Sequence, residues 1–225
     1  MDLIYILEDS AGSETLHIKG ELYKYLIKVR RHKIGDEICF RTRDDLRNLH
    51  TYKLQTIDSR DAVASLVSSA QKDLKSEKSL HVGWCVVDSK SIEKVLPSLC
   101  EIGVERISFI NCDRSQNSFK LDFERFKRIL EASMQQSGRN SYIEFDTYKN
   151  VKEFIAKFPE TKVFDFCDKT LSNSADFKTV LVGCEGGFSK IEKELLSSLE
   201  VFRLDTPMVL RSESAVLAVC SKILL

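Results

Sequence analysis

The chain has 225 residues, of which 43% are hydrophobic, and 34 basic residues balance 34 acidic residues. This length suits one large domain or two small ones with a proper core. A formal net charge of zero excludes a global field that attracts nucleic acid, so any such contact must come from a local patch. We find neither a signal-like start nor an apolar run near the ~20 residues of a membrane span, and we expect a cytoplasmic protein.

Short candidate strands surround one helical segment in the N-terminal part of the chain. The strands are expected at 3–7, 37–42, 52–57 and 62–67, and the helix at 22–31. These elements predict a small β-rich domain over residues 1–70. The segment 71–79 is polar and charged and is expected to be a linker.

Within this domain the helical segment is strongly basic. From Lys24 to Lys33 the sequence reads KYLIKVRRHK, with five lysines and arginines and no acid. Clustered cations of this kind suit contact with RNA phosphates, and Lys24, Lys28, Arg30 and Arg31 are the candidates. The alternative is an ordinary solvated helix face.

Strand-like and helix-like segments alternate over residues 80–225. Strands are expected at 80–87, 106–111, 142–145, 163–166, 180–182 and 201–204, and helices at 91–101, 123–134, 151–157, 189–199 and 214–224. Such alternation predicts an α/β domain with a largely parallel sheet that is covered on both faces. In sheets of this type ligands bind outside the carboxyl ends of the strands.

One such strand end carries three glycines in five residues. The stretch 181–195 reads LVGCEGGFSKIEKEL, so a short apolar run is followed by a glycine loop and then by a helix. Gly183, Gly186 and Gly187 allow positive φ and remove side chains, so that a ligand can approach the backbone. Ser189 and Glu192 fit a capping box for the helix. Four apolar residues are then expected on one face of this helix: Ile191, Leu195, Leu196 and Leu199.

Two other interpretations of this loop stay open. Glycines also serve ordinary tight turns. A strand, a glycine loop and a helix N-terminus can also hold a phosphate group, which would make the chain a non-catalytic RNA-binding or phosphate-binding module. The absence of GxxxxGK[ST] and of GxGxxG counts against nucleotide phosphates and dinucleotides, respectively.

A second polar segment precedes the last expected helix. Residues 204–215 read LDTPMVLRSESA, which places Arg211, Ser212, Glu213 and Ser214 at the start of that helix. An acid at this place is favourable for the helix dipole alone, so Glu213 has a structural explanation as well as a functional one. Arg211 has no comparable structural explanation and is the stronger functional candidate.

The cysteines and histidines lack the spacing of a metal site. The seven cysteines form no CxxC pair, and most of them lie inside apolar runs, so we expect reduced and buried thiols. The four histidines are scattered. We therefore expect no metal ion.

Several of these stretches, taken in order, resemble one family. GCEGGFSKIE is followed about two dozen residues later by PMVLRSESA, and the chain also contains EIGV at 101–104, QSGRN at 136–140, DRS at 113–115 and LIKVRRHKIGD at 26–36. This set resembles the RsmE-type methyltransferases, which methylate N3 of a uridine in the 16S ribosomal RNA of the small subunit. Three residues depart from the family pattern in or near the loops: Cys184 replaces the usual proline, and Thr206 and Met208 replace residues that are often glycine and arginine.

The resemblance implies a SPOUT-class fold. This means a PUA-like RNA-binding domain, followed over residues 80–225 by an α/β domain whose C-terminal segment forms a deep trefoil knot. The resemblance also implies a bent S-adenosylmethionine held mainly by backbone groups of the loops. The residues expected at the cofactor are Phe166, Val182, Gly183, Glu185, Gly186, Gly187, Leu204, Val209, Leu210, Ser212, Ser214 and Ala215.

The same resemblance implies catalytic and RNA-binding roles. Arg211 is expected to stabilise the uracil anion, and Glu213 to orient Arg211 or to accept the proton. The matched motifs add Arg114, Gln136 and Arg139 to the RNA contacts.

Related enzymes of this class act as homodimers, in which the knotted domains pair. The final helix offers apolar residues for such an interface, although these can equally belong to the core of one chain: Val216, Leu217, Val219, Ile223 and Leu224. The expected substrate is 16S RNA within the assembled small subunit.

Overall fold

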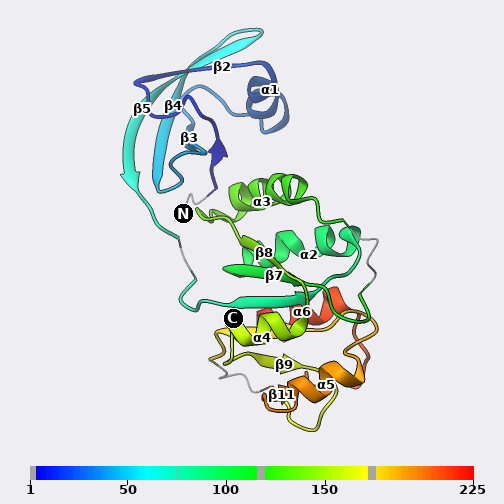
Figure 1. Ribbon diagram of the computed structural model, residues 1–225. Helices are drawn as coiled ribbons and strands as arrows, with labels where there is room; N and C mark the ends of the chain where they lie inside the picture. Colours follow the sequence, from blue (N-terminus) through cyan, green and yellow to red (C-terminus); the bar gives the residue numbers. More distant parts are fainter. Residues whose placement is uncertain (1–3, 75, 116–119, 172–175) are drawn as a thin grey trace. The chain divides into compact units, whose positions relative to one another are not determined.

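The computed structural model describes residues 4–74, 76–115, 120–171 and 176–225, and the chain forms two compact units (Figure 1). The first unit comprises Met1–Leu74 and Gln135–Ser141, and the second comprises Lys75–Met134 and Tyr142–Leu225. The sequence places residues 135–141 in the C-terminal domain, whereas in the structure they pack with the first unit. There the Tyr5 hydroxyl donates a hydrogen bond to the Arg139 carbonyl at 2.7 Å.

The first unit is built on a five-stranded sheet. Its strands, in spatial order, are β1 (Ile6–Leu7), β3 (Glu37–Arg41), β4 (Asn48–Ile57), β5 (Asp61–Gln71) and β2 (Thr15–Lys19). β1 runs parallel to β3, and the other neighbours are antiparallel. The core lies on one face of this sheet because side chains alternate along each strand; on β2, for example, Leu16 and Ile18 are buried while their neighbours are exposed.

The basic segment is helical, as expected, but most of it has π-helical geometry. α1 (Gly20–Tyr23) continues into η1 (Lys24–Val29). Four of the five strands lie where strands were expected, namely β1, β3, β4 and β5, and β2 was not expected. β4 and β5 are longer than expected, and residue 3 of the expected first strand lies outside the described residues.

The second unit contains a six-stranded sheet in which every pair of neighbours is parallel. Its strands, in spatial order, are β11 (Val201–Phe202), β9 (Lys162–Phe164), β10 (Thr179–Val182), β6 (His81–Cys85), β7 (Arg106–Ile110) and β8 (Glu144–Tyr148). Its helices are α2 (Ser89–Glu101), α3 (Phe123–Ser137, whose last residues belong to the first unit), α4 (Val151–Lys157), α5 (Lys190–Leu196) and α6 (Ser212–Leu224). α2 packs against α6, and α4 packs against α5. The predicted α/β class is thus confirmed, because the central strands read as apolar runs that are buried between helices.

The helix after the glycine loop confirms one local prediction and corrects another. The capping box is present: the Ser189 hydroxyl accepts a hydrogen bond from the Glu192 N–H, and the Glu192 carboxylate accepts one from the Ser189 N–H. Only part of the expected apolar face is buried: Leu196 is 3% exposed, whereas Ile191 is 69% exposed and Leu195 is 37% exposed. The inward face carries Glu192 together with Leu196, which lie four residues apart and therefore on one side of the helix.

Candidate active site

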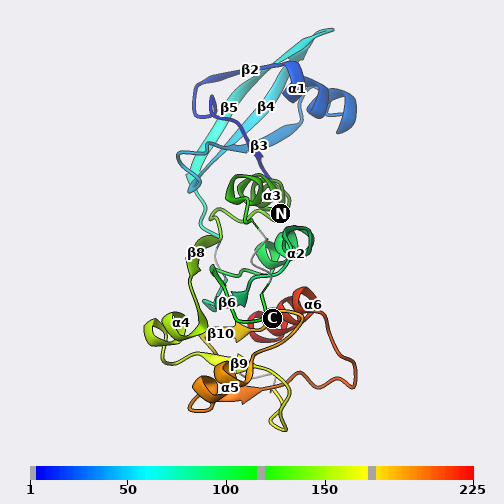
Figure 2. The same cartoon turned by 45° about the vertical axis from the view of Figure 1, so that its right-hand side comes forward.

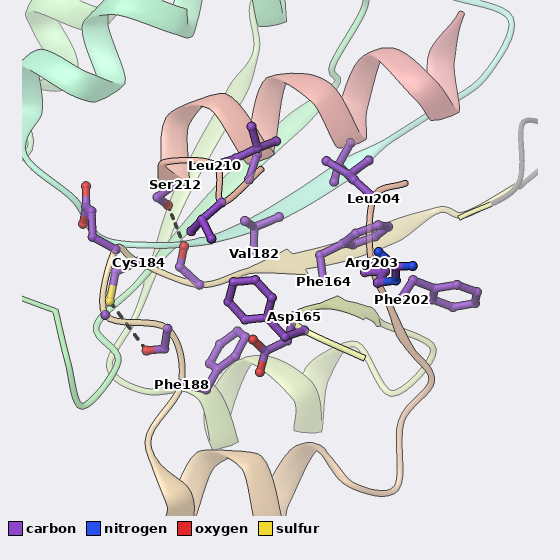
Figure 3. A pocket seen from close by; sticks show the side chains of 18 of the residues that line it. Phe164, Asp165, Val182, Cys184, Phe188, Phe202, Arg203, Leu204, Leu210 and Ser212 are labelled. Carbon is purple, nitrogen blue, oxygen red and sulfur yellow. Dashed lines mark hydrogen bonds between the residues drawn. The ribbon is translucent and has the colours of Figure 1, made fainter. Parts of the chain in front are cut away.

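A cavity of about 350 Å³ lies in the second unit at the carboxyl ends of three neighbouring strands. Phe164 ends β9, Val182 ends β10 and Phe202 ends β11, and all three line the cavity (Figure 3). Parallel strands end at one edge of their sheet, so the loops that follow them surround a common space. Two further walls come from the glycine loop and from the long connection between β11 and α6, which Figure 2 shows as a wide excursion in orange and red.

Two glycines of the loop are needed for different reasons. Gly187 has φ +66°, the left-handed region in which a residue with a side chain is strained. Gly186 has no positive φ, and a Cβ placed on it would lie 3.3 Å from the Arg114 side chain. Of the three glycines, each of which could adopt positive φ, only Gly187 does so, and at Gly186 the missing side chain leaves room for Arg114 instead.

Cys184 is buried in the same loop. Its Sγ lies 3.7 Å from Cys112 Sγ and 3.8 Å from the Gly187 carbonyl oxygen. The contact with Cys112, together with burial, raises the pKa of the Cys184 thiol. The thiol therefore stays protonated and acts as a small packing group rather than as a nucleophile.

A buried hydroxyl joins the loop to the start of α6. Ser212 Oγ donates to the Gly183 carbonyl oxygen at 2.5 Å and accepts from the Trp84 indole N–H at 2.8 Å (Figure 3 shows the first of these bonds). Ser212 is 4% exposed and Trp84 is fully buried. The start of α6 is therefore fixed to the end of β10 and to β6.

The two expected catalytic residues flank Ser212 but do not meet. Arg211 precedes α6 and is exposed, whereas Glu213 lies in its first turn and is 3% exposed. Neither residue lines the cavity, and among the described residues no ion pair joins them. Residues two positions apart at a helix start point to different faces, which accounts for the separation. Glu213 Oε2 is buried and has no hydrogen-bond partner among the described residues.

Charged side chains at the cavity come from five segments, one of which is the glycine loop with Glu185. Lys193 on α5 forms an ion pair with Asp165 at 2.7 Å, and both residues line the cavity. Arg114 and Arg203 line it as well. Arg114, expected to contact RNA, donates a hydrogen bond to the Gly186 carbonyl oxygen at 2.5 Å.

The structure brings almost all of the expected cofactor residues to this one cavity. Those that line it are Phe166, Val182, Gly183, Glu185, Gly186, Gly187, Leu204, Val209, Leu210, Ser212 and Ala215. Ser214 is exposed and does not line it. Sequence reasoning missed Trp84, Asp165, Lys193 and the inward position of Glu192. Of these, only Glu192 had a signal in the sequence, namely its place in the capping box.

The other expected RNA-binding residues lie in the first unit. Lys24 pairs with Glu21 at 2.7 Å on the surface, and Lys28 Nζ lies 5.6 Å from the centre of the Tyr23 ring. Arg30 and Arg31 are exposed, and Arg31 has φ +61°.

Gln136 is exposed as well, but Arg139 is buried. Arg139 Nε donates to the Ser141 carbonyl oxygen at 2.7 Å. This guanidinium therefore holds its own loop, and the expectation that it contacts RNA is not supported by its position.

Among the described residues no group of three or more histidine, cysteine, aspartate or glutamate side chains could hold a metal ion. Five of the seven free cysteines are buried, and Cys39 and Cys167 are partly exposed. No helix in the described part of the chain has the length and apolar character needed to cross a membrane.

Residues 74–224 match the RNA methyltransferase domain family. The cavity, the glycine loop and the parallel sheet thus belong to an RNA methyltransferase, a class of enzyme that must place a methyl donor beside a nucleotide.

The whole chain is similar to more specific relatives. It is 36% identical to ribosomal RNA small subunit methyltransferase E of Helicobacter pylori, with 96% of this chain and 97% of the relative covered. It is 26% identical to the protein of the same name from Aquifex aeolicus, with 97% of each covered. The chain belongs to the ribosomal RNA small subunit methyltransferase E family.

Two solved structures share the fold. The ribosomal RNA small subunit methyltransferase E of Neisseria gonorrhoeae, bound to S-adenosylmethionine, matches with a TM-score of 0.70 at 20% identity, over 96% of this chain and 94% of the other. A Legionella pneumophila methyltransferase in complex with the same cofactor matches with a TM-score of 0.74 at 20% identity, over 98% and 95%.

Proposed function

We propose that this protein transfers a methyl group from S-adenosylmethionine to N3 of a uridine in the 16S ribosomal RNA of the small subunit. The observation that carries the proposal is the cavity against the Gly183–Gly187 backbone, in a chain that is 36% identical to a ribosomal RNA small subunit methyltransferase E. Because its substrate is ribosomal RNA, the protein acts in the cytoplasm.

The residues around the cavity fit S-adenosylmethionine. A volume of about 350 Å³ lies within the range of small-molecule sites. Val182, Leu204, Val209 and Leu210 supply apolar walls for the adenine, and the glycine loop supplies bare N–H and C=O groups. When bound, the cofactor supplies an electrophilic methyl group on a sulfonium. The Neisseria and Legionella structures contain this cofactor, which supports the assignment.

Arg211 is the residue that we assign to catalysis. Uracil N3 carries a proton that must leave, and the resulting negative charge spreads onto O2 and O4, where a fixed cation stabilises it. Arg211 is exposed between Leu210 and Ser212, two residues that line the cavity. It can therefore reach a base that approaches the cavity mouth from solvent.

We assign Glu213 a structural role at the start of α6, which its position in the sequence also allowed. Its carboxylate is buried outside the cavity wall, in the first turn of α6, where negative charge complements the helix dipole. We infer that the N3 proton leaves to water at the cavity mouth rather than to Glu213.

The remaining family features complete the proposal. The β-rich first unit is PUA-like and contacts RNA phosphates through Lys24, Lys28, Arg30 and Arg31. The C-terminal segment forms the trefoil knot and includes the excursion that leads to Ser212.

The protein acts as a homodimer. Its final helix contributes little to the interface, because Val216, Val219 and Ile223 are buried within the chain. Phe166, Met208 and Val209 offer a better surface, being 76%, 70% and 78% exposed next to the cavity. Light scattering that gives a monomer at every concentration would refute the dimer.

Mass spectrometry of ribosomal RNA nucleosides tests the activity. In cells that lack the gene, 3-methyluridine should disappear from 16S RNA, and it should return with the wild-type gene but not with Arg211→Ala. Arg211→Ala should lower turnover by ~10²-fold or more with little loss of cofactor affinity. Persistence of the modified nucleoside, with no other enzyme to supply it, would refute the assignment. Calorimetry that detects binding of ATP but not of S-adenosylmethionine would favour the non-catalytic phosphate-binding module.

A further inference from the structure

The start of α5 and the turn after β7 are held together by one buried carboxylate. Glu192 is 4% exposed. Its Oε1 accepts a hydrogen bond from the Asp113 N–H at 2.9 Å, and its Oε2 accepts one from the Ser189 N–H at 2.8 Å. The Ser189 hydroxyl also donates to the Asp113 carboxylate. Segments that lie 79 residues apart in the chain are therefore fixed to each other at the cavity.

The residue after Asp113 is the one that covers the glycine loop. Arg114 Nη1 donates to the Gly186 carbonyl oxygen at 2.5 Å, and the side chain lies so close to Gly186 that a Cβ there would approach it to 3.3 Å. Arg114 lines the cavity, yet its guanidinium is in contact with solvent. Its direction depends on the backbone of the turn, and Glu192 fixes that backbone.

Helix capping alone does not explain this arrangement. Glu153 occupies the same third position in α4, another seven-residue helix, and its carboxylate accepts from the Lys149 N–H at 3.0 Å. Glu153 is exposed and contacts the start of its own helix. The capping geometry therefore requires neither burial nor a bond to a distant loop, and both features set Glu192 apart.

We propose that Glu192 is a positioning residue for RNA recognition, which acts through the Asp113 backbone to hold Arg114 over the glycine loop, where it contacts a phosphate of the substrate RNA. This inference rests on the proposed function, in which Arg114 meets RNA.

The direction in which Glu192→Gln changes the affinity for RNA distinguishes a positioning role from a purely electrostatic role of Glu192. Glu192→Gln removes a negative charge beside the RNA site, so charge alone predicts tighter RNA binding. The amide of glutamine has one acceptor oxygen and a donor NH₂, so it can satisfy only one of the two N–H groups that Glu192 accepts. Positioning therefore predicts weaker RNA binding, because the turn that carries Arg114 loses a support.

The experiment compares binding of small ribosomal subunits with methyl transfer to them, over a range of salt concentrations. For Glu192→Gln we expect an increase of about tenfold in the Kd and KM for the subunit and a turnover number within about threefold of wild type. The slope of the logarithm of the binding constant against the logarithm of the salt concentration should become shallower by the amount that corresponds to about one phosphate contact. Glu153→Gln, the matched control, should leave all three unchanged. In an Arg114→Ala background Glu192→Gln should have no further effect on RNA binding.

Three outcomes would overturn the inference: unchanged or tighter binding by Glu192→Gln, an equal effect of Glu153→Gln, or full additivity with Arg114→Ala. If Glu192→Gln does not fold, Ser189→Ala, which removes the hydroxyl that donates to Asp113, should weaken RNA binding in the same direction, and its failure to do so would also count against the inference. If the wild type binds subunits but transfers no methyl group, the proposed activity fails, while the binding comparison still decides the role of Glu192.

Discussion

Ser212→Ala should loosen the whole cavity, because a single hydroxyl satisfies two buried groups from other segments. Removing it leaves the Trp84 indole N–H and the Gly183 carbonyl without the bonds that they make at 2.8 and 2.5 Å. An unsatisfied buried group costs about 1–3 kcal/mol, and a partial rearrangement relieves some of this cost. We therefore expect the free energy of unfolding of the second unit to fall by about 2–4 kcal/mol.

Calorimetric or fluorescence-detected thermal unfolding measures this change directly. A loss of this size corresponds to a Tm that is roughly 5–15 °C lower for a unit of this length. Trp84 is the single tryptophan of the chain, so its fluorescence reports the same site that the substitution perturbs. Ser197→Ala is the control, because its hydroxyl donates to the Glu194 carbonyl oxygen on the surface at 2.7 Å. Equal and small shifts for the two variants, below about 0.5 kcal/mol, would refute the view that Ser212 joins three segments.

Three other predictions test separate parts of the second unit. Gly187→Val should weaken S-adenosylmethionine binding at least tenfold in calorimetry, because it forces a β-branched residue to φ +66°. Gly35→Val, at φ +95° in the first unit, is the control and should leave the affinity unchanged. Equal affinities of the two variants for S-adenosylmethionine would show that the loop conformation is dispensable. Glu213→Gln should change the free energy of unfolding by less than about 1 kcal/mol, because the lost helix-dipole interaction and the relief of burying a carboxylate whose Oε2 has no partner oppose each other. Turnover should stay within threefold, and a hundredfold loss would make Glu213 catalytic after all. Burial lowers the pKa of His81 to about 4, so the unfolded state binds the proton first as the pH falls from about 6.5 to 4. The free energy of unfolding, measured against pH, should therefore drop by about 2 kcal/mol across that window. The drop should be absent in His81→Gln, and its persistence in that variant would assign it to another group.

Local patterns in the sequence predicted the parts of the site that depend on neighbouring residues. The capping box of Ser189 and Glu192 spans four residues, and the glycine loop follows a short apolar run, so both could be predicted without tertiary information. The strand β2 was missed because its alternation is short and its outward side chains are polar, which is also typical of a loop.

Contacts between distant segments could not be predicted in this way. Trp84 and Ser212 are 128 residues apart, and nothing in either neighbourhood indicates a bond between them. The exposed Ile191 shows the same limit, because the helical period gives the spacing of the apolar residues but not which face turns inward. In this helix the carboxylate of Glu192 accepts hydrogen bonds from two backbone N–H groups, and Glu192 is therefore buried while Ile191 is exposed.

The glycine loop itself explains why these distant contacts matter. Glycines expose the backbone of the loop to a ligand, but they also supply no side chains with which the loop could hold its own shape. In this chain the shape is imposed from outside, by Ser212 from α6 on the Gly183 carbonyl and by Arg114 from the turn after β7 on the Gly186 carbonyl.

Cys184 makes this external support more important. Where the resembled family usually has a proline, whose ring would fix φ, this chain has a residue that leaves the loop conformationally freer. Packing of the thiol at 3.7 Å from Cys112 and 3.8 Å from the Gly187 carbonyl oxygen replaces part of that rigidity. The backbone groups that face the cavity are therefore ordered by tertiary contacts from other segments, so that substitutions at Ser212 or Cys112 change the donor site without contacting a ligand.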